Sequence, residues 1–133
     1  MKQKLQEQRV KPRGLKRFIN SFKYSLQGLE YAYQNEQSMF IHICMTILVI
    51  VLGILLKLEN YEWLFLFIII GLILSTELMN TAIEATIDLI CQKFDKNAKI
   101  AKDTAAASVF VLSIIAIIGG LYIFVPKLIA LFL

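Results

Sequence analysis

The chain has 133 residues, of which 58% are hydrophobic and 18% are charged, and its formal net charge is +4. A chain of this length makes one domain, and a water-soluble core of that size cannot bury so large an apolar fraction. The composition therefore excludes an ordinary soluble domain and indicates that a lipid bilayer is the solvent for much of the chain.

The N-terminal segment divides into two parts. Residues 1–13 are charged and have no apolar period, so we expect a mobile basic tail there. Residues 14–35 place apolar side chains at the spacing of three and four that gives a helix one apolar face; these are Leu15, Phe18, Ile19, Phe22, Leu26, Leu29 and Tyr33. Basic side chains fall off that face, and the pattern predicts an amphipathic helix on the cytoplasmic surface of the membrane.

Three apolar runs follow, and they extend from Met39 to Leu56, from Trp63 to about Ile83, and from Ala105 to about Val125. Each approaches the ~20 residues that a helix needs to cross the hydrocarbon layer, and unbroken runs exclude the alternating strands of a barrel. We therefore predict an all-α integral membrane protein with one membrane domain over residues 14–133. Its transmembrane helices should cover about 37–57, 62–92 and 103–125.

Basic residues are distributed unevenly between the segments that flank these spans. Eight lysines and arginines precede the first span, whereas the loop from Lys57 to Glu62 has one lysine and two glutamates. Because cytoplasmic loops carry the excess of lysine and arginine, we predict a cytoplasmic N-terminus. The second loop, with four lysines between positions 93 and 103, agrees. Three spans then place the C-terminus outside the cell membrane.

The second predicted helix has an unusual polar face. Its members are Glu77, Asn80, Glu84 and Asp88, which share a stripe roughly 80° wide on a helix that turns ~100° per residue. At ~1.5 Å per residue from Glu62, Glu77 should lie ~22 Å along the helix, within the inner third of a ~30 Å hydrocarbon layer. An acid at that depth costs ~2.5–3.5 kcal/mol on insertion scales, which makes Glu77 a functional-site candidate.

Polar residues of the neighbouring segments fall in the same layer, since Glu36 precedes the first span and Lys102 the third. Phosphoryl transfer requires carboxylates that hold Mg²⁺, a cation for the phosphates and a base beside the acceptor hydroxyl. Glu36 and Glu84 suit the metal, Lys102 the phosphates, and Glu77, shielded from water, the base. The chain has neither a P-loop nor a protein-kinase signature, so ATP would be bound by other means.

A structural interpretation of the same residues is also open. Asp103 fits the N-cap of a helix that starts at Thr104, Asp88 fits a solvated helix end, and Asn80 fits a contact between helices. The small residues from Ala105 to Ser108 would allow the third helix to approach the second closely. Since three helices are too few to enclose both a lipid and ATP, we predict self-assembly with a site shared between subunits.

Taken together, these residues resemble the prokaryotic diacylglycerol kinase family, over Gly14 to about Val125. The most specific part is E-L-M-N-T-A-I-E-A-T-I-D, Glu77 to Asp88, followed by A-K-D-T-A-A-A-S-V, Ala101 to Val109. Weaker support comes from Y-S-L-Q-G-L, which begins at Tyr24, and from the N-E pair that ends at Glu36.

The resemblance implies a homotrimer with active sites between neighbouring subunits. In it, Glu77 would take the proton of the lipid hydroxyl, and Glu36 and Glu84 would bind Mg²⁺ together with the phosphates of ATP. Asn80 would support the lipid site, and Arg17 would lie near both lipid and nucleotide. The remaining nucleotide contacts implied by the resemblance are Tyr24, Asp95, Lys102 and Asp103.

The segment N-E-Q-S-M-F-I-H, which ends at His42, resembles the undecaprenol kinase branch of the family. In that branch an Ile-His pair, here Ile41 and His42, takes the place of a polar Gln-Glu pair; Phe40 departs from the arginine that is frequent there. The resemblance thus implies undecaprenol as the substrate, with diacylglycerol as the alternative. The predicted partners are this lipid, ATP, the bilayer and further copies of the chain, and no nucleic acid.

Two other functions remain open at this point. Glu77 could relay charge in an ion or proton pathway, although the acids gather at one membrane face instead of lining the full depth. The chain could also be a structural or regulatory membrane subunit, in which case neutralising Glu36, Glu84 and Lys102 together would leave function intact.

Overall fold

The computed structural model describes residues 14–132, and every regular element in that range is a helix. The helices are α2 (Leu15–Asn35), α3 (Gln37–Leu55), α4 (Asn60–Ile90) and α5 (Lys96–Phe132). One compact unit ends at Asn35 and a second begins at Glu36. The tail predicted for residues 1–13 lies outside the described part of the chain.

Helix α2 covers most of the segment in which the sequence predicts an amphipathic helix. Its apolar side chains are largely exposed within its own unit, among them Phe18 and Phe22. An exposed apolar face is what an interfacial helix offers to lipid. The location of α2 on a membrane surface stays a prediction.

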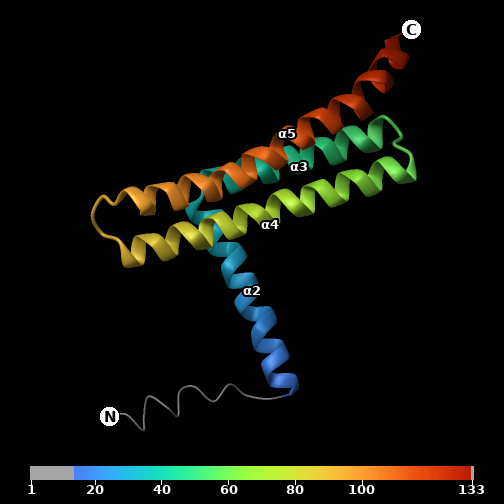
Figure 1. Ribbon diagram of the computed structural model, residues 1–133. Coiled ribbons are helices and arrows are strands. Elements are labelled where there is room, and N and C mark those ends of the chain that lie inside the picture. Colours follow the sequence, from blue (N-terminus) through green and yellow to red (C-terminus); the bar gives the residue numbers. More distant parts are fainter. Residues whose placement is uncertain (1–13, 133) are drawn as a thin grey trace, which may run out of the picture. The chain divides into compact units, whose positions relative to one another are not determined.

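The second unit is a bundle of three helices that run side by side, α3, α4 and α5 (Figure 1). All three are long and apolar enough to cross a membrane. Their outward side chains are large and apolar, which suits contact with lipid. Helix α4 has 31 residues and α5 has 37, so at ~1.5 Å per residue both exceed the ~30 Å hydrocarbon layer.

Helix α5 starts at Lys96 and not near position 103, because Asp95 caps it. The Oδ1 atom of Asp95 accepts hydrogen bonds from the backbone N–H groups of Asn97 (2.8 Å) and Ala98 (3.0 Å). Asp103 therefore lies inside the helix, and its interpretation as an N-cap is wrong. At the other end, α5 continues through Pro126 beyond the predicted boundary at 125.

The end of the bundle that holds the α3–α4 connection is closely packed. An added Cβ at Gly53 would lie 2.8 Å from Cη2 of Trp63, and one at Gly119 would meet the ring of Phe65. The Trp63 and Phe67 rings stack with centroids 5.6 Å apart. The two glycines thus let aromatic side chains fill the space between helices.

Small residues also bring α4 and α5 together toward the opposite end. Ala105 and Val109 of α5 are buried, and the Oγ of Ser108 donates a hydrogen bond to the carbonyl of Ala105. The contact of α5 with α4 agrees with the close approach expected from the Ala105–Ser108 run.

Candidate active site

Helices α3, α4 and α5 together line a cleft of about 370 Å³. Its polar lining comes from the start of α3 and the second half of α4, and consists of Glu36, Ser38, His42, Glu77, Asn80 and Glu84. Its other lining comes from α5, with Ala106, Val109, Phe110 and Ser113. The cleft therefore combines carboxylates with an apolar wall, as a site for the head of a lipid requires.

Glu77 is the most deeply buried polar side chain of the described residues, at 2% exposure. Its Oε1 accepts a hydrogen bond from the hydroxyl of Ser38, and its Oε2 lies 3.8 Å from Nε2 of His42. No lysine or arginine among residues 14–132 forms an ion pair with it. A buried acid with only these two partners is suited to exchange a proton with a ligand.

Asn80 lies between Glu77 and Glu84 on the same face of α4. Its Nδ2 donates a hydrogen bond of 3.0 Å to Oε1 of Glu84. Its Oδ1 is buried and has no hydrogen-bond partner. A buried carbonyl oxygen without a partner costs free energy, so this atom is available to a hydrogen-bond donor or a cation that enters the cleft.

Glu36 stands at the N-cap of α3, at the rim of the cleft. Partial burial raises the pKa of Glu36 above its ordinary value, and the negative charges of Glu84 and Glu77 raise it further. The positive charge of Lys102 acts in the opposite direction. Several acids thus share one region that has too little positive charge to balance them.

The remaining residues predicted for the nucleotide do not line the cleft. Lys102 donates a hydrogen bond of 2.6 Å to Oδ1 of Asp88, and Lys99 pairs with Asp103. Asp95 caps α5. Lys102 and Asp103 lie four and three residues before the cleft residue Ala106 on α5, whereas Asp95 lies eleven residues before it. Their contacts with ATP stay predictions.

Arg17 and Tyr24 belong to α2 and hence to the other unit. Both side chains are exposed within that unit. Their predicted contacts with lipid and nucleotide stay predictions.

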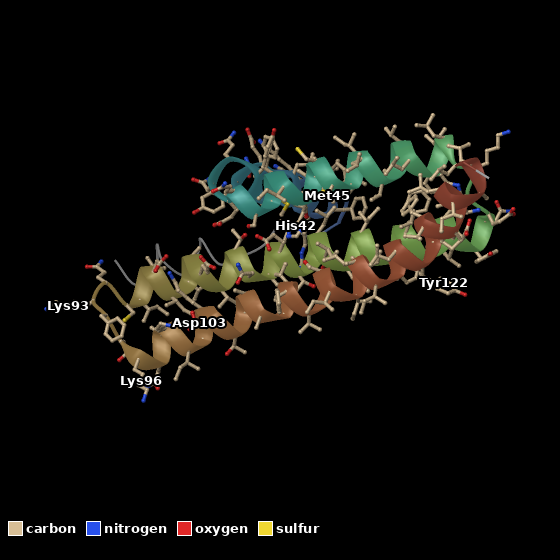
Figure 2. The ribbon with its side chains drawn as sticks, turned by 90° about the horizontal axis from the view of Figure 1, so that it is seen from above. His42, Met45, Lys93, Lys96, Asp103 and Tyr122 are labelled. Atoms are coloured by element: carbon tan, nitrogen blue, oxygen red, sulfur yellow. The ribbon has the colours of Figure 1, made fainter. Side chains whose placement is uncertain are left out.

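Two polar residues of α3 that line the cleft, Ser38 and His42, were not predicted as site residues. They are four positions apart on α3, so they project from one face of that helix. His42 lies where α3 runs beside α4 (Figure 2). This spacing, with a polar residue at each position in an otherwise apolar run, is the signal that could have identified them.

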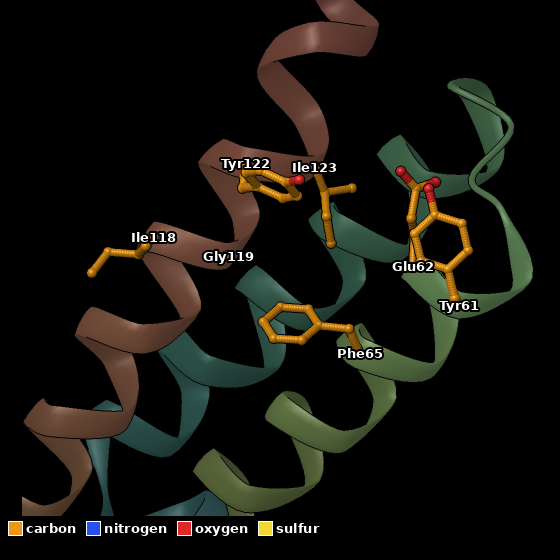
Figure 3. Close-up of a pocket in the computed structure, with 7 residues that line it drawn as sticks. All are labelled: Tyr61, Glu62, Phe65, Ile118, Gly119, Tyr122 and Ile123. Carbon is orange, nitrogen blue, oxygen red and sulfur yellow. The ribbon is translucent and has the colours of Figure 1, made fainter.

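A second cavity, of about 390 Å³, lies between the start of α4 and the end of α5 (Figure 3). It is lined by Tyr61, Glu62, Phe65, Ile118, Gly119, Tyr122 and Ile123. Its one carboxylate, Glu62, accepts a hydrogen bond from the backbone N–H of Glu59 (2.7 Å) and pairs with Lys127 (2.9 Å). Because this acid is already satisfied by the protein, the cavity lacks a reactive group.

The residues that line the cleft lie within a part of the chain that matches a known protein family. A family model described as prokaryotic diacylglycerol kinase matches residues 23–124, which include Glu36, Glu77, Asn80 and Glu84. The chain belongs to the prokaryotic diacylglycerol kinase family. It is accordingly a lipid kinase with ATP as the phosphoryl donor, and with its three apolar helices it is a multi-pass membrane protein.

Individual relatives of the family align with most of the chain. Undecaprenol kinase of Bacillus subtilis is 42% identical over 114 residues, which are 86% of this chain and 93% of the relative. Diacylglycerol kinase of Haemophilus influenzae is 38% identical over 112 residues, 83% of this chain and 94% of the relative. Diacylglycerol kinase of Synechocystis sp. is 37% identical over 112 residues, 84% of this chain but 64% of that longer relative.

The family confirms the predicted lipid kinase and the all-helical membrane fold. An enzyme of this kind replaces the alternatives of an ion pathway and of a purely structural subunit.

Proposed function

We propose that the chain transfers the γ-phosphoryl group of Mg²⁺-ATP to undecaprenol at the cytoplasmic membrane surface, with Glu77 as the base. The observation that carries the proposal is the cleft itself, in which the buried Glu77 shares one space with Glu36, Asn80 and Glu84. Phosphoryl transfer is largely a matter of positioning and charge neutralisation, and this cleft supplies the groups for both.

The reaction at Glu77 is a proton transfer coupled to phosphoryl transfer. The lipid hydroxyl enters the cleft along the apolar wall of α5 and gives its proton to the Glu77 carboxylate. Its oxygen forms a bond to the γ-phosphorus while the bond from that phosphorus to the β-phosphate oxygen breaks, leaving ADP and the lipid phosphate. Glu77 is suited to this role because no cation neutralises it among the described residues.

Magnesium fits the oxygen-rich side of the cleft. Among residues 14–132, no three histidine, cysteine or acidic side chains are grouped so that they alone could hold a metal ion. Mg²⁺ needs less, since it binds through one or two carboxylates together with substrate phosphates. In the proposal Glu36 and Glu84 would provide the carboxylates, and the unpartnered Oδ1 of Asn80 would be a further oxygen available to the ion. The ion, when bound, neutralises charge that develops on the phosphates.

Lys102 is the candidate cation for the phosphates. Its positive charge partly offsets the rise in the pKa of Glu36, and it pairs with the exposed Asp88. An exposed ion pair is weak, so the triphosphate can compete for the ammonium group. Asp95, Asp103, Arg17 and Tyr24 complete the proposed nucleotide site, and Arg17 also contacts the lipid.

A homotrimer with the N-terminus in the cytoplasm and the C-terminus outside completes the proposal. The uneven distribution of basic residues supports this orientation. A cleft of about 370 Å³ is at the small end of the range for a single ligand, whereas the reaction has two. The neighbouring protomer would supply the missing walls.

Mixed oligomers test the shared site. If Glu77 and Lys102 of one site come from different protomers, Glu77→Gln and Lys102→Ala protomers, each inactive alone, should regain activity when they assemble together, because some sites then have both native residues. Co-assembled protomers that remain inactive would show that Glu77 and Lys102 of one site belong to the same chain.

The substrate is tested by supplying purified protein with Mg²⁺-ATP and either undecaprenol or diacylglycerol, and comparing kcat/KM. Undecaprenol is expected to give the higher value, since the undecaprenol kinase relative is the most similar of the three quoted and the Ile41–His42 pair follows that branch. Diacylglycerol is the second candidate, because two of those relatives are diacylglycerol kinases. Phosphorylation of diacylglycerol alone would make diacylglycerol the substrate. Phosphorylation of neither lipid would refute the proposed activity.

A further inference from the structure

The two α3 residues of the cleft are placed around the carboxylate of Glu77 from one side. Ser38 donates its hydroxyl hydrogen to Oε1, and Nε2 of His42 lies 3.8 Å from Oε2. One oxygen of Glu77 is thereby fixed by a hydrogen bond, while the other faces an imidazole. The side chain of His42 is 19% exposed, whereas that of Glu77 is 2% exposed.

A buried base needs a route by which its proton can leave. Each turnover deposits the proton of the lipid hydroxyl on Glu77, and the next turnover requires the carboxylate again. Among the described residues, His42 is the basic side chain within ion-pair range of Glu77. Its exposed edge connects the buried carboxylate with the open part of the cleft.

The charged groups around His42 come from each element of the bundle. Glu36 precedes α3, Glu77 and Glu84 face the cleft from α4, and Lys102 stands next to it on α5. The α5 residues that line the cleft do not titrate; they are Ala106, Val109, Phe110 and Ser113. The described groups around the cleft thus include more carboxylates than cations.

We propose that His42 relays the proton from Glu77 to water, and that Ser38 holds the carboxylate in position for this transfer. The inference rests on the proposed role of Glu77 as the base. After phosphoryl transfer, the proton moves from Oε2 of Glu77 to Nε2 of His42 and then to solvent, which restores both the carboxylate and the neutral imidazole. Both α3 residues are positioning residues, because they act on the substrate through Glu77.

The test is the pH dependence of kcat at saturating Mg²⁺-ATP and lipid, a condition that removes effects of pH on metal binding. Imidazole groups change charge between pH 5 and 8, so kcat of the native enzyme should fall as the pH decreases through this range. His42→Gln keeps a side-chain N–H group but cannot carry the proton. It should lower kcat about tenfold near neutral pH, leave the KM for lipid unchanged and shift the acid limb, which is the fall of kcat at low pH.

Three further variants distinguish a proton relay from a packing role. Ser38→Ala should lower kcat less than His42→Gln and retain the acid limb, because the imidazole is still present. Cys44→Ala, on an exposed part of α3, should behave as the native enzyme. Free imidazole should restore part of the kcat of His42→Ala, which a purely structural role would not allow.

The outcomes distinguish this inference from the proposed function. An inactive Glu77→Gln enzyme together with a native kcat and pH profile in His42→Gln would overturn the relay and leave Glu77 as the base. An active Glu77→Gln enzyme would overturn the base, and the relay with it. If His42→Gln fails to assemble, the pH dependence of kcat in the native enzyme is the test. A native kcat that does not fall as the pH decreases from 8 to 5 would refute the relay.

Discussion

Helix α4 carries a buried glutamate near each end of the bundle, and the two have opposite surroundings. Glu62 is 8% exposed, and its carboxylate is bound by the backbone N–H of Glu59 and by Lys127. Glu77 is 2% exposed, and its partners are a hydroxyl and an imidazole. One acid has the partners that a buried charge needs, and the other does not.

This contrast separates an acid whose charge is used within the fold from the acid that we propose as the base on the same helix. Glu62 begins α4 through a capping box and ties it to the end of α5, so its charge is used within the fold. Among the described residues, Glu77 has no lysine or arginine partner, and the buried Oδ1 of Asn80 accepts no hydrogen bond. Burial alone does not distinguish the two acids, because both are buried and each has two partners; the positive charge of Lys127 beside Glu62 does.

The largest expected effect is the loss of turnover in Glu77→Gln. The amide cannot accept the lipid proton, so kcat should fall about 10³-fold, within the range known for general bases. The matched control is Glu62→Gln, which makes the same chemical change on the same helix and should retain kcat. Transfer of the radiolabelled γ-phosphoryl group of ATP to the lipid measures the turnover of both variants.

The contrast between the two acids would fail if Glu62→Gln lost as much turnover as Glu77→Gln while remaining assembled. Size-exclusion chromatography in detergent establishes assembly before the rates are compared.

The second effect is on stability, and here Glu62→Gln should have the larger effect and Glu77→Gln the smaller one. Glu62→Gln removes the ion pair with Lys127 and weakens the cap of α4, so the free energy of unfolding should fall by about 2 kcal/mol, as expected for hydrogen bonds to a charged group. Glu77→Gln should change it less. Thermal unfolding in one detergent measures both, and the Lys127→Met variant with the corresponding double variant isolates the pair. A more stable Glu62→Gln protein would contradict the structural role.

The third effect concerns pH and Glu36. Its pKa is raised above the ordinary value of 4.5, so in the metal-free protein ionisation of Glu36 opposes folding. The contribution of Glu36 to stability is therefore present below 4.5 and is lost as the pH rises through the raised pKa. Mg²⁺ needs the ionised form, and its apparent Kd should increase about tenfold for each pH unit below that pKa.

Titration of metal-free protein with Mg²⁺ at several pH values, followed by Tm, checks this dependence. Glu36→Gln should bind Mg²⁺ weakly, and most of the pH dependence of its affinity should be gone. An unchanged affinity and pH dependence in Glu36→Gln would exclude Glu36 as a ligand.

The smallest expected effect is on stability, and it concerns two adjacent glycines at the closely packed end of the bundle. A Cβ at Gly119 would meet the ring of Phe65, which has to shift, whereas one at Gly120 would meet nothing within 4 Å. Gly119→Ala should therefore lower the free energy of unfolding by about 1 kcal/mol, and Gly120→Ala should not lower it. The Tm values of Gly119→Ala and Gly120→Ala test this expectation. Equal values would show that Phe65 has room to move.

Much of the fold could be predicted from the sequence, because a bilayer imposes length and composition on whatever crosses it. The apolar runs from Met39, Trp63 and Ala105 all lie in long helices. By sequence, Asp103 fits the N-cap of the third helix, but the hydrogen bonds of Asp95 show that α5 begins at Lys96. The apolar run ends near Val125, and α5 continues beyond it through Pro126 to Phe132.

The site was partly predictable for a similar reason. Helical spacing alone puts Glu77, Asn80 and Glu84 on one face, and these three do line one cleft with Glu36. Spacing within α4 cannot say which residues of α3 and α5 oppose that face, since this depends on how the helices rotate when they pack. His42 and Ser38 were missed for that reason, and the roles of all these residues stay predictions.

One unbroken helix joins Glu62 to Glu77, and this has a consequence for the lipid environment. A rigid rod of ~22 Å fixes how far the carboxylate lies from the opposite membrane surface. When hydrophobic thickness changes, a helix of this kind tilts or the bilayer deforms, so the height of Glu77 relative to the headgroups should shift. Turnover in vesicles of graded acyl-chain length should then pass through an optimum, which ties the rate of the enzyme to membrane mismatch.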